Sequence, residues 1–159
     1  MTPREIADLL AAAFGQSVLE SKTEGVPNPW AAVAPDRVRD AAFFLRDDGR
    51  LQFDSLMCLT GMDHGGGTLG VVYHLDSTTL GHKFVLKVKV PAADPRVPSV
   101  EAVWKVANWL EREAYDMVGV VFDGHPDLRR ILLPDDWEGV PLRKDYRVPE
   151  FYNGMKVPY

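Results

Sequence analysis

The chain has 159 residues, of which 46% are hydrophobic and 26% are charged, a composition that fits one compact domain and excludes a disordered or fibrous chain. Its formal net charge of −5 at pH 7 argues against a nucleic-acid binder, because such proteins need a basic face to displace counterions from phosphate. The one cysteine, Cys58, excludes an intrachain disulfide and a four-thiolate iron–sulfur site, and we expect it to be buried in the core.

The first predicted element is a helix over residues 3–14. Thr2 offers a capping hydroxyl, Pro3 stands at the first helical position, and Glu5 occupies the matching position of a capping box. Apolar residues then recur at helical spacing, and Gly15 provides the usual stop. The apolar face of this helix is therefore expected to belong to the core. The same residues lack the basic start and apolar block of a secretory signal.

Two short strands are predicted next, over residues 18–22 and 30–33. A turn must separate them, because Pro27 and Pro29 prevent regular structure there. Residues 36–46 then carry apolar side chains on one side and end in a polar, glycine-containing segment. This pattern predicts a second amphipathic helix that packs on the sheet.

Three extended runs follow, over residues 56–62, 69–75 and 83–90, and the last of them alternates with a period of two. Glycines 65–67 join the first pair and residues 78–81 the second, which predicts an antiparallel meander. The glycine pattern at 65–70 also matches a dinucleotide-binding turn. We reject that interpretation because a strand, rather than a helix, follows it.

The last long element is predicted to be a helical stretch from about residue 99 to 118, broken near Asn108 and ended by Gly119. Beyond it, prolines and glycines separate short apolar pieces, so the end of the chain must be held by something other than ladder hydrogen bonds. We expect one α+β domain over residues 1–159, with a mixed, largely antiparallel sheet and packed helices. Its core would span about 1–119, and an extended, partner-binding C-terminal arm about 120–159.

Catalytic and metal-binding patterns are weak. Asp123, His125 and Asp127 form an Asp-x-His-x-Asp pattern that is more typical of a turn with an oriented imidazole than of a metal site. Asp135 and Asp136 follow a proline and are best interpreted as a cap of a turn or helix. A free-standing hydrolase that uses His125 with Asp123, Asp127 or Asp135 stays open as a distant alternative.

The region from residue 110 onward is dense in charge of both signs. On the predicted helix, an apolar stripe faces one way, and we expect Arg112 and Asp116, one turn apart, to pair on the opposite, charged face. Arginines and aromatic side chains, including Tyr159, follow in the proline-rich arm and are typical of an interface. We expect Arg129→Ala or Arg130→Ala to weaken assembly with a partner more than the fold itself.

The segment that begins at Glu111 resembles the family motif of the 30 kDa or C subunit of respiratory complex I, the NADH:quinone oxidoreductase. The resemblance rests on the runs 111–119, with His125 and Arg129 after it, 124–139 and 141–146, and it extends upstream to about Gln52. The residues of the motif that we assign to the interface with other subunits are Glu111, Arg112, Glu113, Asp116, His125, Arg129, Arg130, Asp135, Asp136, Trp137, Arg143, Lys144, Asp145 and Tyr146.

The resemblance implies a non-redox structural subunit of a proton-translocating NADH:quinone oxidoreductase, with no catalytic residue in this chain. It implies that NADH, FMN, iron–sulfur clusters and quinone are held by other subunits. Expected partners are the D subunit of the complex above all, then its B and I subunits, at the cytoplasmic face of the cell membrane. The corresponding subunit of a membrane-bound hydrogenase, or of another quinone or ferredoxin oxidoreductase, is the alternative.

Overall fold

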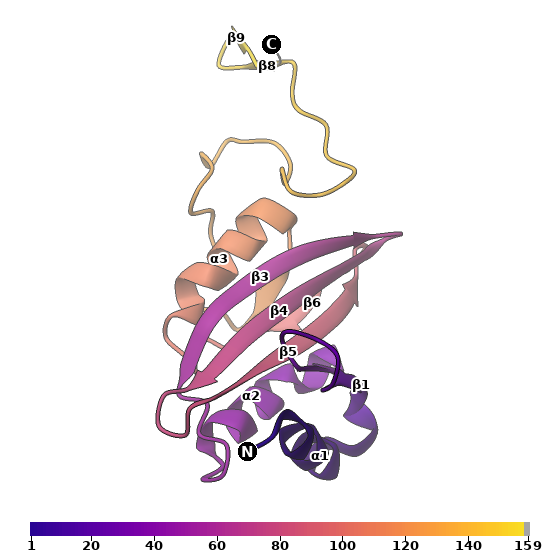
Figure 1. Cartoon of the computed structure of the whole chain (residues 1–159). Coiled ribbons are helices and arrows are strands. Elements are labelled where there is room, and N and C mark those ends of the chain that lie inside the picture. The colour runs from indigo at the N-terminus through magenta and orange to yellow at the C-terminus, as the bar shows by residue number, and fades with distance from the viewer. Residues whose placement is uncertain (158–159) are drawn as a thin grey trace.

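A computed structural model describes residues 1–157 and confirms the predicted α+β class (Figure 1). The helices are α1 (Pro3–Phe14), α2 (Val38–Asp47) and α3 (Ala107–Val118), with short 3₁₀ turns at Gly15–Ser17 and Pro35–Arg37. The strands are β1 (Val18–Lys22), β2 (Trp30–Val33), β3 (Ser55–Gly65), β4 (Thr68–Ser77), β5 (His82–Pro91), β6 (Arg96–Pro98), β7 (Val121–Asp123), β8 (Phe151–Tyr152) and β9 (Met155–Lys156).

The start of α1 follows the predicted capping pattern. The backbone N–H of Glu5 donates to the hydroxyl of Thr2 at 3.3 Å, and the N–H of Thr2 donates to the Glu5 carboxylate at 2.7 Å. Ile6 and Leu10 are fully buried, which confirms the core role of this helix face.

The main sheet has five strands in the order β1-β2-β5-β4-β3. The predicted meander is confirmed, since β3 pairs antiparallel with β4 and β4 with β5. The hairpin of β1 and β2 joins this meander in parallel, with Trp30 opposite Val85. The largest sheet is therefore mixed, with one parallel pairing among antiparallel ones.

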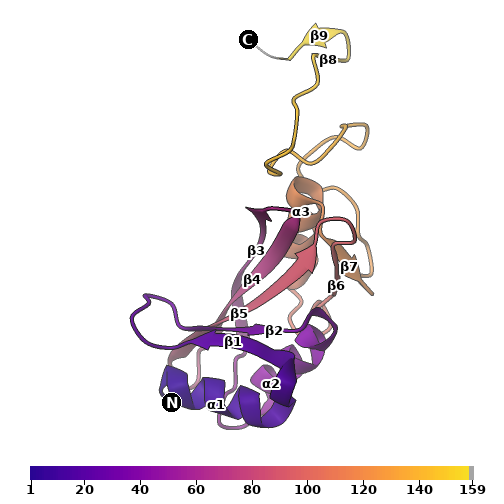
Figure 2. The same ribbon diagram turned by 90° about the vertical axis from the view of Figure 1, so that its right-hand side faces the viewer.

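The three helices lie on one side of this sheet, as the two views show (Figures 1 and 2). α1 contacts β1 and β2, whereas α3 packs against β3. Alternate residues of β5 point into the layer between sheet and helices, where Phe84, Leu86 and Val88 are each about 1% exposed. The opposite side, which we call the outer face, carries Lys83, Val85, Lys87 and Lys89 of the same strand.

Two predictions about the core need correction. The helix expected from residue 99 begins only at Ala107, because residues 101–106 form turns in which the N–H groups of Val103 and Trp104 both bond to the carbonyl of Val100. Cys58, expected to be buried, is half-buried beside the hydroxyl of Thr60, at 3.2 Å, because a bulge follows Leu56 in β3.

α3 approaches β3 closely at Gly61. A Cβ atom there would lie 3.1 Å from the Cβ of Ala114 and 3.2 Å from that of Val118. We expect Gly61→Val to lower the free energy of unfolding by about 1–3 kcal/mol, because the added methyls must displace the helix. Urea unfolding measures the loss, with Thr60→Val on the outer face as the control. Equal losses in both variants would place the cost in the strand rather than in the helix contact.

Candidate functional site

Residues 120–157 are called the arm from here on; the arm begins in the body of the molecule, where Val120 and Phe122 are buried, and its later part extends away from the body beyond α3 (Figures 1 and 2). β7 pairs in parallel with β6, and the chain then runs without regular structure until the small hairpin of β8 and β9. From Asp123 to Val157, every described residue is half-buried or exposed. The arm therefore has almost no apolar core of its own.

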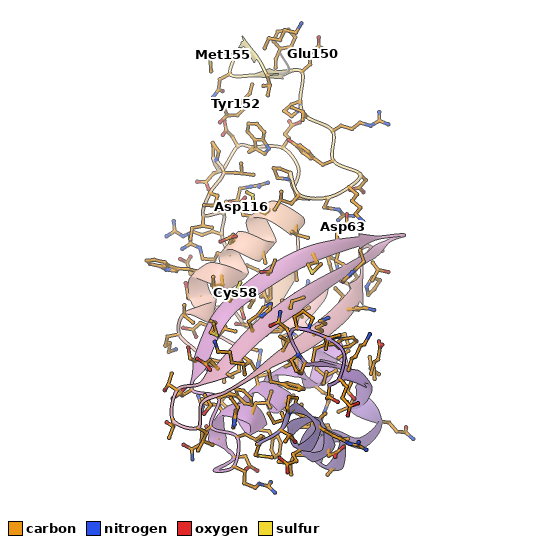
Figure 3. The ribbon with its side chains drawn as sticks, in the orientation of Figure 1. Cys58, Asp63, Asp116, Glu150, Tyr152 and Met155 are labelled. Carbon is orange, nitrogen blue, oxygen red and sulfur yellow. The ribbon has the colours of Figure 1, made fainter. Side chains whose placement is uncertain are left out.

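Asp116 of α3 holds the first part of the arm (Figure 3). Its carboxylate is fully buried, and Oδ2 accepts the backbone N–H groups of three consecutive residues, Ile131, Leu132 and Leu133, at 3.0, 2.8 and 2.9 Å. Oδ1 accepts from the guanidinium of Arg130 at 2.8 Å. Burial tends to raise the pKa of Asp116, but these hydrogen bonds outweigh it and hold the pKa below its ordinary value. The side chain is thus a charged acceptor for an otherwise unpaired backbone.

Arg112 and Arg130 also hold the arm, and together with Asp116 they form what we call the clamp. Arg112, also buried, donates from Nε and Nη2 to the carbonyls of Arg129 and Arg130 at 3.1 and 3.0 Å. The predicted pairing of Arg112 with Asp116 on a solvated helix face is therefore wrong, since each side chain bonds to the arm instead. Arg130 donates further along the arm, to the carbonyls of Trp137 and Gly139 at 2.9 and 3.1 Å.

His125 forms the predicted turn with an oriented imidazole. Its Nδ1 accepts the backbone N–H of Asp127 at 3.0 Å, so its Nε2 must carry the proton that is donated to the carbonyl of Asn108 at 2.9 Å. The carboxylates beside it pair locally, Asp123 with Arg96 and Asp127 with Arg129. Both ring nitrogens of His125 are therefore engaged by backbone groups of this chain.

The middle of the arm is attached at the ends of α3 and β3. The N–H of Leu142 donates to the carbonyl of Met117 at 2.9 Å. The N–H of Lys144 donates to Oδ2 of Asp63 at 2.8 Å, while Oδ1 accepts from Gly65 at 2.7 Å. Sequence reasoning assigned no role to Asp63, and its only signal is that it lies in a stretch that shares the family resemblance.

Aromatic contacts link the middle of the arm to its terminal hairpin. Trp137 donates from Nε1 to the hydroxyl of Tyr146 at 3.1 Å, and its ring lies 5.0 Å from that of Tyr152. The Tyr152 hydroxyl donates to Asp136 at 2.8 Å. Residues 135 and 136 do form a turn, but the carboxylate of Asp136 holds Tyr152 instead of capping it.

The remaining predicted interface residues lie at the surface or outside the described range. Glu113 and Asp135 are exposed, and Arg143 pairs with Asp145, two residues further along the chain. Tyr159 lies outside the described residues. The contact of all these residues with a partner stays a prediction.

Exposed large apolar side chains are frequent in α3 and the arm. Among residues 1–157, large apolar side chains that are substantially exposed are densest after residue 105, and Trp109 on α3 is 71% exposed. The members in this part of the chain are Val106, Trp109, Leu132, Leu142, Val148, Phe151 and Met155. Exposed aromatic and large apolar side chains are enriched at sites of interaction with other proteins.

Glu111 belongs to the same motif but points into the core. Its carboxylate accepts from the hydroxyl of Ser99 at 2.6 Å and from the N–H of Val100 at 2.7 Å. Burial raises its pKa to about 7, although these two hydrogen bonds pull in the opposite direction. The buried hydroxyl of Tyr73 has no partner among the described residues, and burial together with the charge of Glu111 raises its pKa well above the ordinary value. Glu111 ties the segment before α3 to the helix.

The raised pKa of Glu111 predicts a pH dependence. The folded state binds more protons than the unfolded chain between about pH 4.3 and 7, so stability falls as pH rises through this window. We expect a drop of roughly 1–3 kcal/mol in the free energy of unfolding that Glu111→Gln abolishes, because glutamine keeps a donor and an acceptor but does not titrate. Urea unfolding of both proteins from pH 5 to 8 tests this, and parallel curves would contradict it.

Metal-binding clusters and membrane-spanning helices are both absent from residues 1–157. No group of three or more histidine, cysteine, aspartate or glutamate side chains in this range could hold a metal ion. No helix in the same range is long and apolar enough to cross a bilayer. That cofactors are held by other chains stays a prediction.

Known proteins resemble this chain over most of its length. The sequence model of the family described as "Respiratory-chain NADH dehydrogenase, 30 Kd subunit" matches residues 31–152. The C subunit of an NADH-quinone oxidoreductase of Chloroherpeton thalassium is 50% identical over 99% of this chain, which spans 66% of that relative. A protein of the same name from Chlorobium phaeobacteroides is 46% identical, and the match covers 96% of this chain and 93% of the relative.

Solved structures share the fold. The trypsin-resistant fragment, residues 1–134, of Nqo5 superposes with a TM-score of 0.68 at 30% identity, and the match covers 80% of this chain and all of the fragment. A chain of the membrane-bound sulfane sulfur reductase, an archaeal respiratory membrane complex, superposes with a TM-score of 0.76 at 26% identity. That match covers 91% of this chain and 85% of the other.

Proposed function

The chain belongs to the family of the 30 kDa subunit of respiratory-chain NADH dehydrogenase, and from this membership we propose that it is a non-redox structural subunit of a proton-translocating NADH:quinone oxidoreductase. In this role the chain holds together the quinone-reducing module in the hydrophilic, peripheral part of the complex. The complex transfers electrons from NADH to quinone, and the isolated chain is inert. NADH, FMN, iron–sulfur clusters and quinone are held by other subunits.

The observation that carries this proposal is the way the arm is attached. Its inner side is fixed by backbone hydrogen bonds to Asp116, Arg112 and Asp63, whereas its other side chains gain little from this chain's own core. An irregular segment with exposed Leu132, Leu142 and other apolar groups gains stability when another polypeptide covers it. Such a segment suits a scaffold rather than an enzyme.

The proposed partners are the D subunit of the complex as the main contact, with the B and I subunits beside it. The complex would place the chain at the cytoplasmic face of the cell membrane through its partners. Two relatives that carry the name of the C subunit, at 50% and 46% identity, support this choice of complex.

A second candidate is the corresponding subunit of a related membrane complex without NADH oxidation, such as a hydrogenase or another quinone or ferredoxin oxidoreductase. The chain of the sulfane sulfur reductase complex supports it, because 91% of this chain superposes on that fold. The higher identity to relatives from NADH-quinone oxidoreductases makes it the weaker candidate.

Affinity purification of the tagged full chain from its source membranes tests both candidates. We expect the D, B and I subunits to be recovered together with the NADH-oxidising subunits, and NADH-dependent quinone reduction in the eluate. Hydrogenase or ferredoxin-linked subunits in place of the NADH-oxidising ones would favour the second candidate. A lone chain would contradict both, and turnover by that chain lost in His125→Ala would favour the hydrolase.

A further inference from the structure

The outer face of the main sheet is turned toward the viewer in Figure 1, away from the helices, and two adjoining depressions hollow it. One, of about 290 Å³, reaches from β2 to the end of β3, and the other, of about 210 Å³, continues it toward the start of β3. Both are lined by Pro27, Asn28, His74 and Val85, so they form one hollow, called the trough below. The loop between β1 and β2 makes one of its walls.

The floor of the trough is apolar and its rim is adaptable. Val72 and Val85 form the floor and are only 8% and 4% exposed. Met57 and Met62 of β3 line its two halves with side chains that are about half exposed. Flexible methionines at the rim of an apolar hollow can repack around apolar side chains of another molecule.

The charge of the trough is opposite in sign to that of the whole chain. Lys83 lines one half and Lys87 the other, and Lys89 follows on the same face of β5. None of the described residues that line the trough is an aspartate or a glutamate. Lys87 lies with its Nζ 3.9 Å from the ring centroid of Trp30, and burial lowers its pKa although Glu20 opposes this. A partner carboxylate would stabilise both lysines.

The charge and the shape of the trough indicate which kind of partner it can bind. A second copy of this chain would bring two lysine-lined troughs together, and like charges that face each other across an interface are unfavourable. A lipid bilayer is flat and would meet the rim without filling the apolar floor. An extended peptide fits, because the trough crosses three strand spacings, or about 14 Å, which about four extended residues span.

We propose that the trough binds an extended, acidic segment of another subunit of the complex, with apolar side chains on the floor and carboxylates at Lys83 and Lys87. This proposal rests on the function proposed above, since it requires a complex. It concerns a different face of the molecule from the arm.

Photo-cross-linking in the assembled complex tests the proposal. The tagged full chain carries p-benzoylphenylalanine in place of Met62, or of the exposed Leu19 on β1 as the control, and the purified complex is irradiated and digested for mass spectrometry. We expect an adduct from position 62, and not from position 19, with a carboxylate-containing segment of another subunit. The charge reversal Lys83→Glu with Lys87→Glu should lower its yield by about fivefold or more, whereas Lys105→Glu on the α3 side should not.

The alternative results are distinct. An intact complex in which position 62 forms no adduct overturns the trough proposal, and so does an adduct with a second copy, with lipid, with this chain itself or with a segment that lacks carboxylates. Recovery of the tagged chain without any other subunit overturns the proposed function and the trough's occupant together.

Discussion

Asp116→Ala is expected to release the arm from α3 while the five-stranded sheet stays folded. The substitution leaves three backbone N–H groups without their acceptor and removes the counter-ion of Arg130, a loss of roughly 3–5 kcal/mol for removing one partner of a buried pair. Hydrogen exchange followed by mass spectrometry should show lost protection over residues 131–133, with little change in β4. Purification from membranes should recover less of the complex.

The matched control is Asp127→Ala, which removes an exposed carboxylate that pairs, among residues 1–157, only with its near neighbour Arg129. Water screens this pair, which should therefore add little stability. The lowered pKa of Asp116 adds a pH test. The contribution of the Asp116 carboxylate to stability is complete above the ordinary aspartate pKa of about 3.9, and it is lost as pH falls through the lower pKa of the folded state. Unchanged exchange over residues 131–133 in Asp116→Ala would show that other contacts hold the arm.

Arg130→Ala is expected to weaken both the arm and the assembly, by roughly 2–5 kcal/mol, because Asp116 loses its counter-ion and two carbonyls lose their donor. The adjacent Arg129→Ala is the comparison. Its guanidinium is exposed and bonds only to Asp127 within the described residues, so the isolated variant should unfold at the same urea concentration as the original protein. Exchange kinetics and native gels of both variants measure the effects on the arm and on the assembly.

Comparing the two variants distinguishes an arginine that stabilises the fold of this chain from one that contacts another subunit. Loss of the complex in Arg129→Ala, without a change in the isolated chain, would place that guanidinium in a contact with another subunit. Equal behaviour of the two variants would contradict the distinct roles that their contacts indicate.

Local signals explain which elements the sequence predicts well. The capping residues Thr2 and Glu5 fix the start of α1, and the period of two in residues 83–90 fixes β5, since both patterns lie within a few neighbouring residues. Val100, Val103 and Trp104 have helical spacing but belong to turns, because the side chain of Glu111 binds Ser99 and the N–H of Val100. The conformation of this segment therefore depends on Glu111, which lies outside it in the sequence.

The clamp could not be predicted for a related reason. Charged side chains are usually solvated, so the alternation of charge in α3 indicates an exposed face, whereas Arg112 and Asp116 are buried. Their partners are backbone groups of residues 129–133. Because nearly every residue type carries the same backbone N–H and carbonyl groups, the sequence of residues 129–133 does not indicate these hydrogen bonds. The resemblance to the family marks these residues as important, and only the structure shows which backbone groups they bind.

The parallel pairing of β2 with β5 has a consequence for the order of events on the ribosome. Trp30 cannot meet Val85 until the synthesised chain includes β5, whereas β3, β4 and β5 close on one another through short turns. The helix α1 and the hairpin of β1 and β2 therefore emerge before the strand that joins them to the meander, and until then the apolar side of α1 has only β1 and β2 to cover it. Nascent chains that end before β5 are the ones we expect ribosome-associated chaperones to hold.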